Sequence, residues 1–169
     1  MGWLMDKQER LKNLVGIVWL YVLITGVFSF LNRMVSYIVQ GISGKSINSF
    51  LLMNGLWIVA VLLILFFSGR MYRKLGGRLP AGMAESPLQL IGVGLLVLIN
   101  GIISLSNILP TYVISGIQLF QTLPQMDGNG EAIYTRSILA HAVSTLLMLC
   151  QILTGVYLLY RGKKSGSKE

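Results

Sequence analysis

The chain has 169 residues, of which 54% are hydrophobic and only 12% are charged, and its formal net charge is +8. Soluble domains average about 25% charged residues, so this composition excludes an ordinary soluble domain. Its polar segments are too short to bury a core of their own, and we expect no aqueous domain within the sequence.

Four long stretches of the sequence carry no charged residue. A helix needs about 20 apolar residues to cross a hydrocarbon core about 30 Å thick, and each stretch is at least that long. We therefore predict an all-α integral membrane protein, a four-helix bundle with four transmembrane helices. In chain order, the stretches are residues 13–32, 46–69, 86–126 and 137–160.

The basic residues flank these stretches unevenly. Eleven of the 14 precede the first stretch or follow the second or fourth, and only Arg33, Lys45 and Arg136 lie in the other connections. Because basic residues are retained on the cytoplasmic side, we expect both termini in the cytoplasm of a bacterial cell, with the protein integral to the plasma membrane. Tyr72 and Tyr160, just before basic residues, are typical of the aromatic belt at that interface.

Two separate segments of the sequence are similar to each other. Residues 18–42 align with residues 93–117 without a gap, and 11 of the 25 positions are identical. We predict one membrane domain, residues 1–169, with an internal repeat whose halves are about residues 11–78 and 87–164. The halves would be two tandem helical hairpins of the same orientation, a parallel repeat. The alternative is coincidence in a chain rich in Leu, Ile, Val and Gly.

A polar stripe runs along the first helix of each half. Its polar residues recur at steps of 4, 3, 4, 4 and 3 in both copies, which places them on one helical face. Polar side chains in a membrane turn toward partner helices or a wet cavity. The stripe therefore predicts either interhelical hydrogen bonds or an outward-open polar cavity. The candidate residues are Thr25, Gly26, Ser29, Asn32, Asn54, Asn100, Gly101, Ser104, Asn107 and His141.

The stripe continues beyond the expected outer surface of the membrane. Residues 33–44 and 108–123 keep an apolar face opposite the polar one, which is typical of amphipathic helices. Pro110 interrupts backbone hydrogen bonding near the start of the second segment and favours a bend there. We expect short interfacial helices on the outer side after spans 1 and 3; the alternative is that the spans themselves extend outward.

The predicted spans contain few of the residue types that carry out catalysis. They contain no Asp or Glu, and His141 and Cys150 are the only histidine and cysteine of the sequence. Proton-coupled transport usually relies on intramembrane carboxylates or histidine relays, so a proton-driven exporter is disfavoured. We expect no enzyme activity, no cofactor and no metal site.

The pattern favours a non-enzymatic accessory or scaffold subunit of the bilayer, which assembles with itself or with other membrane proteins and binds no nucleic acid. The alternative is a carrier, channel or binder for a small or amphiphilic molecule, with the polar stripe lining its cavity. A third hypothesis, an enzyme acting on lipid, requires an acid or His pair that converges at one interface, and an isolated His141 would exclude it.

Overall fold

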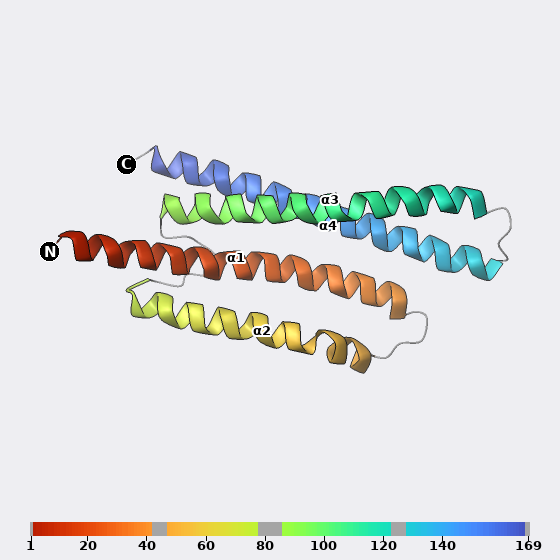
Figure 1. Cartoon of the computed structure of the whole chain (residues 1–169), viewed down its shortest axis with the longest axis horizontal. Helices are drawn as coiled ribbons and strands as arrows, with labels where there is room; N and C mark the ends of the chain where they lie inside the picture. The colour runs from red at the N-terminus through yellow and green to blue at the C-terminus, as the bar shows by residue number, and fades with distance from the viewer. Residues whose placement is uncertain (1, 42–46, 78–85, 123–127, 168–169) are drawn as a thin grey trace.

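The computed structural model describes residues 2–41, 47–77, 86–122 and 128–167, whose regular structure is helical. Its elements are α1 (Gly2–Gly41), α2 (Ile47–Lys74), α3 (Pro87–Thr122) and α4 (Gly128–Gly166). The helices run alternately up and down, so that α1 begins and α4 ends at the same end of the bundle (Figure 1).

Within the described residues, four helices are long and apolar enough to cross a membrane, as the sequence predicts. The candidate spans are Lys7–Ile38, Asn54–Lys74, Pro87–Pro110 and Ile138–Gly166. The protein is therefore an α-helical membrane protein. Because α1 has 40 residues and rises about 1.5 Å per residue, it is about twice as long as the hydrocarbon core is thick.

The segments expected as interfacial helices are not separate elements. Residues 33–41 continue α1, and residues 108–122 continue α3 through Pro110. Residues 42–44 and 123 of this prediction lie outside the described residues. The helices match the alternative of extended spans, and neighbouring helices can support a proline within such a helix.

Local sequence signals set the connection from α2 to α3. Gly76 has a φ of +81°, a left-handed conformation that glycine adopts at helix C-termini. Ser86 caps α3, because its Oγ accepts a hydrogen bond from the backbone N–H of Gln89 at 3.3 Å, and Pro87 occupies the first helical position, where it loses no helical hydrogen bond.

Helix α1 lies at the centre of the arrangement and packs against α2, α3 and α4. Its Leu20 is buried together with Val93 and Val97 of α3, and we call these three side chains the apolar layer. The side chains packed around it are Ile17, Trp19, Tyr21, Ile24 and Leu158. Helix α2 lies along α1 and leaves most of its large apolar side chains exposed.

Helices α3 and α4 approach each other closely through glycine. A Cβ atom on Gly155 would lie 2.7 Å from the backbone N of Leu98 and 2.9 Å from the backbone O of Gly94. Small residues that let backbones approach are a main source of helix association in membranes, where water provides no hydrophobic driving force. The sequence alignment does not extend to this contact, because Trp19 is aligned with Gly94.

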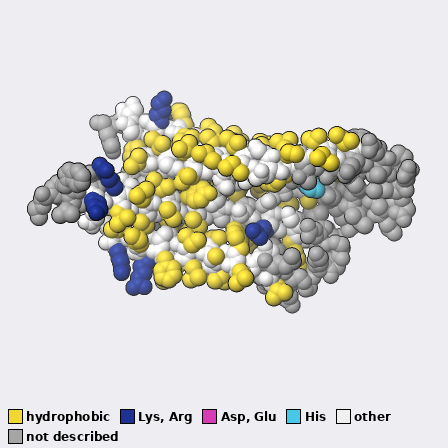
Figure 2. All heavy atoms as spheres, in the orientation of Figure 1, with side chains coloured by type: hydrophobic (Ala, Val, Ile, Leu, Met, Phe, Trp, Pro, Cys, Tyr) yellow, Lys and Arg dark blue, Asp and Glu magenta, His cyan; other side chains and the backbone are white. Residues whose placement is uncertain are grey.

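The visible surface has two zones (Figure 2). Apolar side chains cover much of its middle, and most of the visible Lys and Arg side chains gather where α1 begins and α4 ends. We call this the basic end. The basic residues of α1, α2 and α4 near it are Lys7, Arg10, Lys12, Arg70, Arg73, Lys74, Arg161, Lys163 and Lys164.

We predict that Gly155→Ala destabilises the bundle by about 1–3 kcal/mol, the usual range for overpacking, because the added methyl group would meet backbone atoms of α3. Gly55→Ala is the matched control, since nothing lies within 4 Å of its Cβ position. Thermal unfolding in the same detergent measures both. Equal stability of the two variants would contradict the close α3–α4 contact.

Candidate functional site

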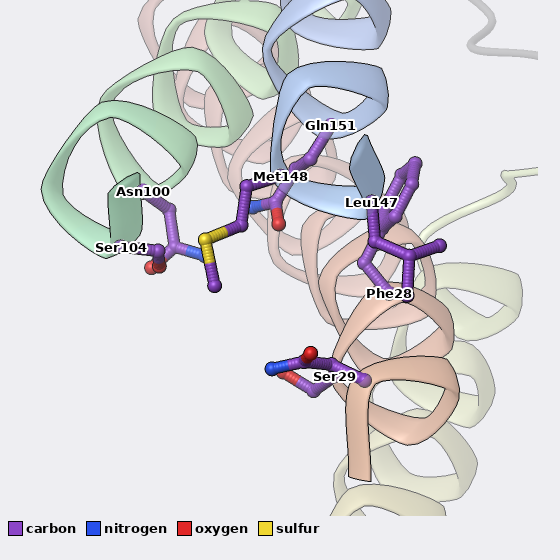
Figure 3. Close-up of a pocket in the computed structure, with 8 residues that line it drawn as sticks. Phe28, Ser29, Asn100, Ser104, Leu147, Met148 and Gln151 are labelled. Carbon is purple, nitrogen blue, oxygen red and sulfur yellow. The ribbon is translucent and has the colours of Figure 1, made fainter. Parts of the chain in front are cut away.

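A small polar cavity lies between α1, α3 and α4 (Figure 3). Its volume is about 50 Å³, and one water molecule needs about 10–15 Å³ of such space. The cavity therefore has room for a few water molecules or one small solute. Its lining residues are Phe28, Ser29 and Asn32 of α1, Asn100 and Ser104 of α3, and Leu147, Met148 and Gln151 of α4.

The cavity brings together the polar stripes of the two halves. Ser29 and Asn32 approach from α1, and Asn100 and Ser104 approach from α3. The two helices begin at the same end and pack against each other, so their polar faces meet. The residues that meet are not aligned with each other, because Asn100 aligns with Thr25 and not with Asn32.

Two buried polar atoms of the lining have no hydrogen-bond partner: Asn32 Oδ1 and Gln151 Nε2. The first is an acceptor and the second is a donor. Leaving such a group unsatisfied costs about 1–3 kcal/mol, and no bulk water reaches the bilayer core to compensate. A molecule that donates to Asn32 and accepts from Gln151 would satisfy both.

Gln151 lines the cavity but is not among the residues that the sequence predicted for a site. It lies outside both polar stripes, on the fourth span, yet only 6% of its surface is exposed. The available signal was that it is the only Asn or Gln in the uncharged stretch of residues 137–160. No comparable signal marks Phe28, Leu147 or Met148, which complete the lining as apolar side chains.

Asn54 does not join the cavity. Its Oδ1 accepts a hydrogen bond of 2.6 Å from Nη1 of Arg33, and the guanidinium carbon of Arg33 lies 4.7 Å from the ring centroid of Trp57. Arg33 therefore links α1 to α2 through a charge-assisted hydrogen bond and a cation–π contact. The expected cluster of Asn32 with Asn54 is not formed, because Asn54 bonds to Arg33 whereas Asn32 lines the cavity between α1, α3 and α4.

Two other stripe residues of α1, Thr25 and Gly26, are not among the lining residues of the cavity. The Thr25 hydroxyl donates to the backbone carbonyl of Tyr21 at 2.7 Å, which satisfies it inside α1. Gly26 lies against Val61 of α2.

In the second half, Gly101 lies against Ile152 of α4. Asn107 is exposed, and His141 is half-buried on α4 and is not part of the cavity lining. Among the described residues, no group of three or more His, Cys, Asp or Glu side chains could hold a metal ion.

A second polar group lies near the basic end, and we call it the Gln89 cluster: Asn13, Tyr72, Ser86 and Gln89. Gln89 Nε2 donates to Asn13 Oδ1 at 3.0 Å and to Tyr72 Oη at 3.1 Å. Ser86 Oγ donates to Asn13 Oδ1 at 3.1 Å. Gln89 is fully buried, and these bonds join α1, α2 and α3.

Tyr72 therefore differs from its expected role in an aromatic belt. It is only 4% exposed, whereas Tyr160 is 64% exposed. The reason is the hydrogen bond to Gln89, which gives the Tyr72 hydroxyl a partner inside the bundle. A tyrosine before a basic residue does not distinguish these two placements in the sequence.

No family model matches this chain, and no curated protein or solved structure matches it.

We predict that Tyr72→Phe lowers the free energy of unfolding by about 1 kcal/mol, a typical value for a lost hydrogen bond, because it removes one of the contacts of the buried Gln89 amide. Tyr160→Phe loses the same hydroxyl at an exposed position and provides the control. Thermal unfolding in detergent compares them. A Tyr72→Phe variant as stable as Tyr160→Phe would show that the Gln89 cluster does not stabilise the bundle.

Proposed function

We propose that this membrane protein is a binder or carrier of a small, uncharged polar molecule, which it holds in the polar cavity. The observation that carries the proposal is the pair of unsatisfied atoms, Asn32 Oδ1 and Gln151 Nε2, in one cavity. Interhelical hydrogen bonding alone would leave these groups paired with each other or with neighbouring helices.

The lining favours an uncharged ligand. It contains amide and hydroxyl groups, and no Lys, Arg, Asp, Glu or His side chain is among its residues. A charged ligand would enter the membrane without a compensating charge, which is costly. A ligand with one acceptor and one donor, such as an amide or an alcohol of a few heavy atoms, matches both the chemistry and the volume.

A second candidate function, an accessory or scaffold subunit that assembles with itself or with another membrane protein, is favoured by α2. This helix packs along α1 and presents an apolar outer face, on which Leu52 is 86% and Leu56 is 88% exposed. A second copy of the chain would cover this face, and lipid would cover it in the absence of a partner.

We further propose that the protein lies in a bacterial plasma membrane with its basic end in the cytoplasm. The gathering of basic side chains at one end of the bundle supports this orientation, because basic residues are retained on the cytoplasmic side.

We also propose that the two halves arose by duplication. In support, Gly26 and Gly101, which are equivalent in the alignment, each lie against the second helix of their own half.

We predict that Asn32→Leu and Gln151→Met each reduce binding of urea or glycerol about tenfold, the effect of roughly 1.4 kcal/mol. Saturation-transfer NMR on the protein in nanodiscs measures this binding. Neither substitution should lower thermal stability, because each removes an unsatisfied buried polar group and the cavity can take up the larger apolar side chain. Asn107→Leu, at an exposed position, is the control. Unchanged binding in both cavity variants, or no binding by the wild type, would refute the proposal.

We predict that Leu56→Cys in a Cys150→Ala background forms a disulfide-linked dimer under mild oxidation in native-like membranes. Leu153→Cys in the same background is the control, because Leu153 is 66% exposed on α4. Non-reducing electrophoresis and light scattering report the result. Equal cross-linking at both positions, or none at Leu56, would count against α2 as the self-association face.

A further inference from the structure

The polar cavity is partly open to the surface of the bundle. Of its eight described lining residues, Met148 and Gln151 are buried and the other six are partly exposed. Two of these six are apolar, Phe28 of α1 and Leu147 of α4, and in the close-up they lie on the side opposite the polar side chains of α3 (Figure 3). The cavity therefore has a polar side and an apolar side, and the apolar side reaches the surface.

This opening lies at the depth of the hydrocarbon core. Asn100 is 13 residues after Pro87, the first residue of α3. Gln151 is 10 residues before Arg161, which belongs to the basic end. At a rise of about 1.5 Å per residue, the two lining residues are about 20 Å and about 15 Å from the basic end. Both depths fall within a core about 30 Å thick.

The surface beside the opening is apolar. Val27, Ile103 and Leu146 are exposed, and each directly precedes a lining residue of its own helix. Exposed apolar side chains at this depth contact lipid chains. Because bulk water is absent from the hydrocarbon region, the molecules that meet this opening are those dissolved in the bilayer.

Resting on the proposed function, we infer that the ligand is a membrane-dissolved amphiphile, an alkyl chain that carries one uncharged amide or hydroxyl head. The head accepts a hydrogen bond from Gln151 Nε2 and donates one to Asn32 Oδ1, the two atoms without partners. The alkyl chain leaves the cavity past Phe28 and Leu147 and continues into the surrounding lipid.

The size and the chemistry of the cavity agree with this division of the ligand. A volume of about 50 Å³ holds a head of a few heavy atoms but not the chain attached to it. The chain stays among apolar groups when the head binds, so its surroundings change little. The head gains two hydrogen bonds that hydrocarbon cannot provide, and burial of a polar group without such bonds is costly.

The test is photolabelling of the whole chain in lipid nanodiscs with a decanamide that carries a diazirine in its alkyl chain. Mass spectrometry then identifies the labelled peptides. We expect labelling of peptides that contain Phe28 or Leu147, and we expect unlabelled decanamide to displace it. Decane, which has the chain without the head, should not displace it.

Two variants separate the head from the chain. Gln151→Met should reduce the displaceable labelling about tenfold, because the head loses its hydrogen-bond donor. Leu147→Asn keeps a similar side-chain size but places a polar group beside the alkyl chain, so labelling should fall about tenfold while urea binding in the NMR experiment does not decrease. Leu149→Asn is the matched control and should label like the wild type, because Leu149 is 45% exposed on α4 and does not line the cavity.

Labelling of other peptides only, or equal displacement by decane, would overturn the inference, because the label would then report general lipid contact. These wild-type results decide the question even if Leu147→Asn fails to fold. Equal labelling of Leu147→Asn and Leu149→Asn would also overturn the inference. Urea binding without displaceable decanamide labelling would overturn it and leave the proposed function standing, whereas binding of neither molecule would remove both.

Discussion

The constraint on which the rest of this structure depends is that polar groups inside a membrane must find partners within the protein. At the Gln89 cluster this requirement is met, because Gln89 donates to Asn13 and to Tyr72. At the polar cavity it is not met, because Asn32 and Gln151 each keep a buried atom without a partner. A satisfied cluster holds helices together, whereas an unsatisfied pair indicates a site for a molecule that brings its own donor and acceptor.

The packing explains how the cavity arises. Gly94 and Gly155 let the backbones of α3 and α4 approach closely, and α1 packs against both helices. The polar side chains of the three helices then converge where large apolar side chains do not fill the space. Helix α2 adds to the bundle from the other side of α1, where Arg33 contacts Asn54 and Trp57, and it contributes nothing to the cavity lining.

The sequence predicted the four spans, because runs of uncharged residues have few alternatives to crossing a membrane. It also singled out Ser29, Asn32, Asn100 and Ser104, because helical spacing shows which side chains share a face. It did not predict that Gln151 would complete the cavity or that Tyr72 would be buried, because both depend on which helices are neighbours. The sequence analysis expected interfacial helices after spans 1 and 3, with extended spans as the alternative, and α1 and α3 match the alternative. Pro110 did not reveal this, because a proline does not break a helix that neighbouring helices support.

The most direct measurement of the central claim is an experimental density map of the protein in a lipid nanodisc at a resolution that shows ordered water. We expect density in the polar cavity within hydrogen-bonding distance of both Asn32 Oδ1 and Gln151 Nε2, from water or from a bound solute. A cavity without density, or a direct hydrogen bond between the two side chains that closes it, would contradict the assignment of this cavity as a binding site.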